Sequence, residues 1–223
     1  MISLIAIVAF TFCLAVPAFS LKARAPIDYQ EMGRHALEIT NEQNKSDSEI
    51  VFSNKAITIY ESDLKEAIDM ENALDANEIS LDDSIEKIIQ RKSLLQTALE
   101  KGYIATEDEF QQYKESLMSS YQEAENKEDL DEYWNGFGGV ENYWKQMKPQ
   151  IMENLAIRKY LDSQMADYAQ KVKSNVKDID FQQEWAEVEN QIKKDAGLKA
   201  VTNTELKKIL EEAKKLKEKD EME

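Results

Sequence analysis

Three short polar signatures mark helix starts in this chain and direct most of it toward helical structure. In each, a hydroxyl side chain stands three residues before an acidic one. The pairs are Ser80 with Asp83, Thr106 with Glu109, and Thr202 with Glu205. In such a capping box the hydroxyl accepts a hydrogen bond from a first-turn N–H, and the carboxylate reaches back to the backbone. Because apolar residues at helical spacing follow each pair, the sequence predicts a mainly α fold.

Apolar stripes with a period near 3.6 extend this prediction along the chain. They run from Leu64 to Leu74, Ile85 to Leu99, Phe110 to Tyr121, Met147 to Tyr168, Trp185 to Ile192, and Leu206 to Ala213. Gly102 and Gly197 are placed to end two of these helices, and Pro149 either opens or kinks another. Residues 50–52 and 56–60 are rich in β-branched and aromatic side chains, which predicts a very small β element.

The N-terminal residues 2–21 form an uncharged, apolar run as long as a membrane-crossing helix. Pro17 and the small residues after it are typical of a processed secretory signal. No basic residue precedes the run. Because basic residues are expected on the cytoplasmic side of such a segment, their absence there argues against export of the residues that follow. Residues 1–25 are therefore predicted to be a signal peptide or a membrane anchor, and the sequence leaves cleavage open. Both alternatives place the protein outside the cytoplasm, secreted or attached to the membrane.

Three further segments follow from changes in composition. Residues 26–48 are polar and lack a sustained period, which predicts a flexible tether. His35, the only histidine, lies there and is expected to be exposed and without a function. Residues 49–202 are predicted to be one helical domain. Residues 203–223 are predicted to be a charged C-terminal helix or tail whose end frays.

The net charge of −16 limits the partners of this chain. Binding to nucleic acid requires clustered lysine and arginine, so no nucleic-acid partner is expected. No glycine-rich phosphate loop is present, so no nucleotide is expected. No other cofactor is expected either. An EF-hand loop beginning at Asp131 would place Tyr133 and Asn142 where calcium needs carboxylates, so no metal is predicted there. Gly138 and Gly139 instead predict a reversal between two helices.

Two sequence marks, "IYESDL" at residues 59–64 and the run from Ala98 to Glu109, belong to a wider pattern that includes "GGVENYWKQMKPQIMENLAIRKYL". Residues 49–172 resemble the SurA N-terminal domain family, the helical chaperone module of SurA-type and PrsA-like foldases. The stretch "WAEVENQIKKDAGLKAV" is similar to the closing helix and strand of such proteins. Lys55 and Tyr60 depart from the usual turn glycine and capping threonine.

The resemblance implies a chaperone, and the isomerase activity of such foldases is not expected here. The prolyl isomerase module of such foldases requires roughly a hundred further residues and paired histidines, which this chain lacks. The carboxylate pairs Asp82–Asp83 and Asp129–Asp131 are typical of solvated helix starts. The chain is therefore predicted not to be an enzyme.

Six side chains around the glycine turn are the candidate client-binding site. They are Tyr133, Trp134, Phe137, Tyr143, Trp144 and Met147. At helical spacing they either form ordinary core or line an apolar groove that holds unfolded polypeptides, as the resemblance implies. We expect Trp144 to belong to the core and Trp134 to contact clients.

Two hypotheses for the function follow. In the first, the protein is an extracytoplasmic, ATP-independent chaperone-like protein that binds unfolded or nascent exported polypeptides. In the second, it is a membrane-anchored helical interaction or spacer module for one dedicated partner. The two hypotheses differ in whether the protein binds several unrelated clients.

Overall fold

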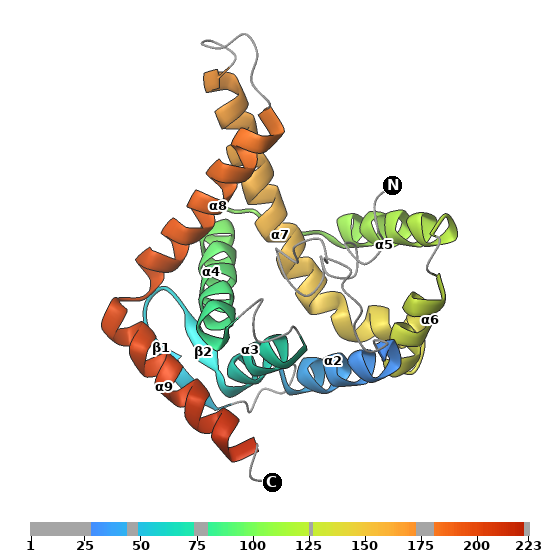
Figure 1. The fold of residues 1–223 in the computed structure, drawn as a ribbon. Helices are drawn as coiled ribbons and strands as arrows, with labels where there is room; N and C mark the ends of the chain where they lie inside the picture. The colour runs from blue at the N-terminus through green and yellow to red at the C-terminus, as the bar shows by residue number, and fades with distance from the viewer. Residues whose placement is uncertain (1–27, 44–48, 74–79, 125–126, 173–180, 221–223) are drawn as a thin grey trace. The chain divides into compact units, whose positions relative to one another are not determined.

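A computed structural model describes residues 28–43, 49–73, 80–124, 127–172 and 181–220. These residues form eight helices and one two-stranded sheet, which confirms the mainly α fold (Figure 1). Within these ranges no helix is both long enough and apolar enough to cross a membrane. The predicted signal peptide or anchor at residues 1–25 lies outside the described residues.

The chain divides into two compact units. Unit 1 combines residues 1–46 with residues 105–155, and unit 2 combines residues 47–104 with residues 156–223. The prediction of one domain over residues 49–202 is therefore wrong. The prediction treats one continuous segment as one core, whereas residues 105–155 belong to unit 1 and the residues before and after them belong to unit 2.

Unit 2 begins with the predicted small β element. Strand β1 (Ile50–Ser53) pairs antiparallel with strand β2 (Thr58–Tyr60). The Asn54 side-chain oxygen accepts hydrogen bonds from two backbone N–H groups of the turn, at 2.8 and 3.0 Å. This Asn-based turn closes the hairpin with Lys55 in place of the usual glycine.

Helix α3 (Glu61–Ala73) follows β2 without a linker. The Asp63 carboxylate accepts a hydrogen bond of 2.7 Å from the Tyr60 backbone N–H. That is the acidic half of a capping box. It fixes the helix start although Tyr60 has no side-chain acceptor suited to the other half.

Helix α4 (Leu81–Glu100) has both of its predicted ends. Ser80 and Asp83 form the complete capping box. At the other end Gly102 has a φ of +81°. The Tyr103 N–H donates to Ala98 O at 2.9 Å and the Gly102 N–H donates to Leu99 O at 3.0 Å, the two bonds of a Schellman motif.

The Asp83 cap makes stability depend on pH. Hydrogen bonds from the Ser80 side chain and backbone lower the pKa of the Asp83 carboxyl. The ionised form therefore stabilises the folded state above the ordinary aspartate pKa of about 4, and this contribution is lost as pH falls below it. We expect Asp83→Asn to lower the free energy of unfolding by about 0.3–1 kcal/mol at pH 7. Chemical denaturation at pH 7 and pH 3 should show that difference shrinking; an unchanged difference would contradict this assignment.

Helix α8 (Phe181–Ala200) packs against α4, as Figure 1 shows. Gly197 lies inside this helix, so the predictions that it ends the helix and that a strand follows are wrong. A Cβ atom there would lie 3.0 Å from the Gln90 side chain. The glycine thus allows close approach of two helices, and the Ser93 hydroxyl donates to Ala196 O at 2.9 Å beside it.

The C-terminal helix α9 (Asn203–Asp220) is part of unit 2 and not an appendage. Thr202 and Glu205 form the predicted cap, with the carboxylate 2.7 Å from the Thr202 N–H. Ile209 and Ala213 are buried in the unit 2 core. The predicted boundary at residue 203 is therefore wrong, because the apolar face of α9 completes this core.

The core of unit 2 is mostly aliphatic. One cluster of its buried residues consists of Ile57, Ile59, Leu64, Ala67, Ile68, Leu81, Ile85, Ile88, Ile89, Ala200, Val201, Ile209 and Ala213. A buried ion pair lies beside them. The Arg91 guanidinium donates to both Glu66 carboxylate oxygens at 3.0 and 2.9 Å, and the Glu66 side chain is 1% exposed.

Unit 1 contains α2 (Tyr29–Gln43), α5 (Glu107–Gln122), α6 (Lys127–Gly136) and the first half of α7 (Val140–Val172). Helix α2 contradicts the predicted flexible tether over residues 29–43. Pro149 lies well inside α7, so the alternative in which it opens the helix is also wrong.

Candidate functional site

The stretch from α6 to α7 is the turn between helices that the sequence predicts. Gly138 and Gly139 have φ values of +80° and +109°, which disfavour other residues. The Gly139 N–H donates to Trp134 O at 2.8 Å, and the Asn142 amide donates to Phe137 O at 2.5 Å. Across the described ranges, no group of three or more His, Cys, Asp or Glu side chains has an arrangement that would hold a metal ion.

All six candidate client-binding side chains lie in the core of unit 1. Their exposed fractions are 2% for Tyr133, 4% for Trp134, 0% for Phe137, 2% for Tyr143, 3% for Trp144 and 0% for Met147. The ring of Tyr143 contacts those of Tyr133, Phe137 and Trp144 edge to face, and other pairs of the cluster are tilted. The Tyr143 ring centroid lies 5.1 Å from Phe137 and 5.1 Å from Trp144. This geometry favours aromatic pairs beyond the area they bury.

This burial contradicts a client groove lined by these six residues. Trp144 is core, as expected, but the expectation that Trp134 contacts clients is wrong. Its ring packs 4.9 Å from the ring of Tyr121 on α5. With so little exposed surface, neither tryptophan offers a contact to a client in this conformation.

The aromatic core holds two polar atoms without partners. The Tyr133 hydroxyl and the Trp144 indole nitrogen are buried and have no hydrogen-bond partner among the described residues. Burial raises the pKa of Tyr133 well above its ordinary value, with a smaller contribution from Tyr143. The hydroxyl therefore stays protonated and carries no charge into the core.

Helix α2 contacts α6 through two glycines. A Cβ atom on Gly33 would lie 2.0 Å from the Tyr133 backbone oxygen, and one on Gly136 would lie 2.2 Å from the Gln30 backbone oxygen. Both distances are far below any real contact of a Cβ atom with backbone. The two helix backbones therefore touch at this crossing, and it has room for glycine only.

Sequence reasoning missed this crossing. Its signal is a stripe at helical spacing along α2, made of Tyr29, Gly33, Ala36, Leu37 and Thr40. The stripe is hard to recognise in the sequence, because polar residues surround it and several of its own residues are small or polar. Only the position of Gly136, about a hundred residues later in the chain, shows why a glycine stands at Gly33.

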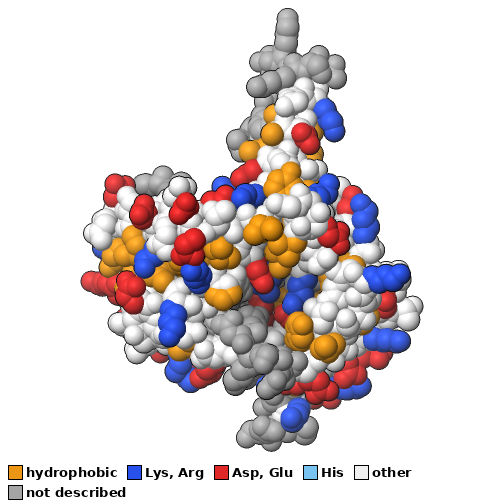
Figure 2. Space-filling view, turned by 180° about the vertical axis from the view of Figure 1, so that it is seen from behind, with side chains coloured by type: hydrophobic (Ala, Val, Ile, Leu, Met, Phe, Trp, Pro, Cys, Tyr) orange, Lys and Arg blue, Asp and Glu red, His pale blue; other side chains and the backbone are white. Residues whose placement is uncertain are grey.

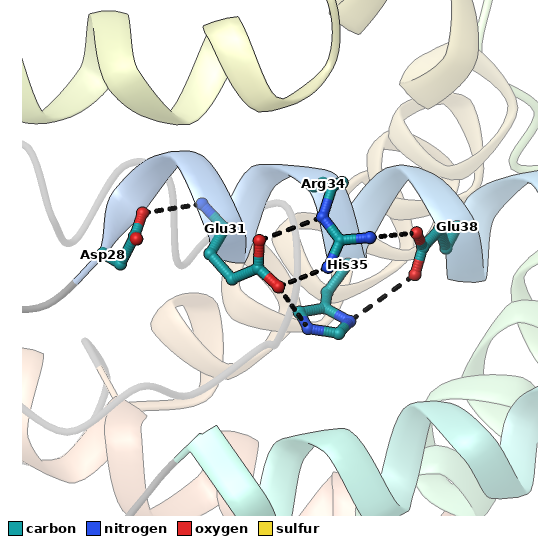
Figure 3. Close-up of polar contacts among 5 residues, drawn as sticks. All are labelled: Asp28, Glu31, Arg34, His35 and Glu38. Carbon is teal, nitrogen blue, oxygen red and sulfur yellow. Dashed lines mark hydrogen bonds and ion pairs between the residues drawn. The ribbon is translucent and has the colours of Figure 1, made fainter.

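The outer side of α2 carries a ladder of charges (Figure 3). Arg34 donates to Glu31 at 2.9 Å and to Glu38 at 2.7 Å, and Arg34 lowers the pKa of Glu31 chiefly by hydrogen bonding. The Asp28 carboxylate accepts from the Glu31 N–H at 2.8 Å. His35 is 53% exposed and lies 3.2 Å from Glu31. The prediction that His35 is exposed is confirmed, although it lies on a helix.

The surface of unit 1 combines negative charge with partly exposed apolar side chains. The described residues of unit 1 carry 15 acidic and 5 basic side chains, whereas those of unit 2 carry 21 and 18. Tyr113, Met118, Tyr121 and Met152 are partly buried against the aromatic core. Figure 2, which draws the whole chain, shows hydrophobic side chains exposed among acidic and basic ones on the face in view.

Comparisons with protein-family models, curated proteins and solved structures found no match. The resemblance to the SurA N-terminal domain therefore rests on the sequence marks described above.

Proposed function

We propose that this protein is an extracytoplasmic, ATP-independent chaperone-like protein that binds unfolded or nascent exported polypeptides. The observation that supports it most is the mixed surface of unit 1. Partly exposed tyrosine and methionine side chains, among them Met118 and Met152, lie on a unit whose described residues carry 15 carboxylates and only 5 basic side chains. This surface replaces the buried aromatic cluster as the proposed client-binding site.

Such a surface suits clients of varied sequence. Methionine side chains are flexible and polarisable, so they adapt to different apolar segments. Carboxylates around them favour basic segments and keep the complex soluble. The contacts need no nucleotide, and release then follows from weak affinity or from folding of the client.

The test is suppression of aggregation with several unrelated unfolded clients, without nucleotide. A general chaperone should suppress the aggregation of most of them at a few-fold molar excess, and most strongly for basic clients at low salt. Suppression limited to a single client would favour the dedicated-partner module. No suppression of any client would refute the chaperone proposal.

The location is proposed from the apolar run at residues 2–21. A reporter enzyme that is active only outside the cytoplasm, fused after Glu223, should be active because that run directs export. Deleting residues 2–20 should abolish the reporter activity. An inactive reporter, with the full-length fusion protein found in the cytoplasm, would contradict the proposed location.

We propose no prolyl isomerase activity, because no part of the resemblance covers that module. The protein should leave the cis–trans isomerisation of a prolyl tetrapeptide at its uncatalysed rate, which takes tens of seconds. A protease-coupled assay measures this directly. Acceleration that persists through a second purification would show that the protein is an enzyme.

A further inference from the structure

We propose that α2 is a displaceable occupant of a helix-docking surface on unit 1, and that amphipathic helices with glycine at the crossing compete for this surface. The surface consists of Tyr133, Gly136 and Met147. The identity of the competing helix as a segment of a client rests on the proposed function. The docking surface itself does not.

The contact between α2 and this surface follows one stripe of the helix. Gly33 meets the Tyr133 backbone and Gly136 at the crossing. One turn and two turns later, Ala36 is 4% exposed and the Thr40 hydroxyl lies 3.4 Å from the Met147 sulfur. At the other end of the stripe, Asp129 and Glu132 raise the pKa of the Tyr29 hydroxyl, after the larger effect of burial.

Helix α2 contributes few side chains to the aromatic cluster that it covers, although Ile39 and Thr40 of this helix are also buried. Ala36 is its only buried member of the unit 1 cluster, alongside partly buried Tyr29 and Leu37. The other buried members come from the continuous segment 105–155 and include Phe110, Trp134, Trp144 and Ile151. Because that segment supplies nearly all of the buried side chains, it has the means to stay folded when α2 leaves.

Helix α2 also carries its own local stabilisation. The Asp28 cap and the Arg34 bonds to Glu31 and Glu38 all join residues three or four positions apart within the helix or its cap. Pairs at this spacing stabilise a helix without any tertiary contact. The apolar stripe of α2 is small, so its contact with unit 1 is expected to be weak. Covalent attachment to the same chain keeps the helix bound, because it gives an effective concentration on the order of millimolar.

The partner that fits has the pattern of α2. It is a helix with glycine at the crossing, a small residue three positions later and apolar residues beside them. Any larger residue at the crossing would meet the Tyr133 backbone, which cannot yield as a flexible side chain does. The surface is thus selective because it excludes helices that carry a side chain at the crossing position.

The test uses a fluorescent peptide of residues 28–43 as the probe and three forms of the full chain. In the wild type, attached α2 outcompetes the peptide. In Gly33→Leu, the clash should displace α2 and leave the surface free, so the peptide should bind at least about tenfold more tightly than to the wild type. In Gly136→Leu, the surface itself is blocked, and binding should be lost. A peptide carrying Gly33→Leu should bind none of the three.

Each alternative outcome is decisive. Gly33→Leu protein that is folded by near-UV circular dichroism and still does not bind the peptide would overturn the proposal. Unfolding of unit 1 in that variant would show that α2 is an integral part of the core and would overturn it as well. Peptide binding without any suppression of client aggregation would support the docking surface and count against the chaperone function only.

Discussion

Replacing Trp144 or Trp134 by alanine should lower the free energy of unfolding of unit 1 by about 3–5 kcal/mol. The two indoles are 3% and 4% exposed and lie within one aromatic cluster. Each truncation removes a large buried apolar surface and leaves a cavity among rings that cannot fully collapse. A loss of this size approaches the whole stability of a typical domain.

The measurement is chemical denaturation followed by circular dichroism, with Leu198→Ala as the control. Leu198 is 72% exposed, so its truncation should change the free energy of unfolding by no more than about 0.5 kcal/mol. A loss below about 1 kcal/mol for Trp134→Ala would show that this ring is not core and would restore it as a client contact.

Arg91→Met should destabilise unit 2 by about 3–5 kcal/mol, because it leaves the Glu66 carboxylate without its bidentate partner. That carboxylate is 1% exposed, and the guanidinium binds both of its oxygens. Desolvating a charge is costly unless an opposite charge and hydrogen bonds compensate it. The expected loss in the free energy of unfolding therefore reflects mainly the cost of the buried Glu66 charge and less the strength of the ion pair itself.

The double variant Glu66→Leu with Arg91→Met separates these two contributions. It removes both charges and should recover most of the stability that Arg91→Met loses. Denaturation of the single and double variants provides the comparison. A double variant as unstable as the single one would show that packing of the arginine stem, and not an uncompensated charge, causes the loss.

Local chemistry made most helices predictable. Helices α4, α5 and α9 begin directly after their cap residues Ser80, Thr106 and Thr202, and the carboxylate three residues after each of these completes the cap. These bonds form between near neighbours in the chain, so the sequence alone reveals them. The same holds for the end of α4 at Gly102 and for the turn at Gly138, where positive φ favours glycine.

Contacts between distant residues explain what the sequence did not reveal. Gly33 and Gly197 each allow two helices to approach closely, but their neighbours, Gly136 and Gln90, lie about a hundred residues away. Without those neighbours, Gly33 looked like part of a tether and Gly197 like a helix end. The structure gives both a packing role.

The prediction of the client-binding site was wrong for a related reason. Helical spacing shows that Trp134 and Trp144 share faces with other aromatic residues, but it does not show whether another helix covers that face. The ring of Tyr121 on α5 covers Trp134. Partly exposed side chains such as Met118 lie at the edge of the same cluster, and their exposure depends on packing that the sequence does not specify.

The central claim is that the surface of unit 1 holds unfolded clients, and two matched double variants test it. Met118→Ser with Met152→Ser changes partly exposed side chains of unit 1, whereas Ile104→Ser with Leu198→Ser changes side chains of unit 2 that are 61% and 72% exposed. Both proteins are first compared with the wild type by thermal melting, and suppression of client aggregation is then measured. We predict that the unit 1 variant loses at least about half of the suppression while the unit 2 variant keeps it. Equal suppression by both variants, or a loss confined to the unit 2 variant, would contradict the account.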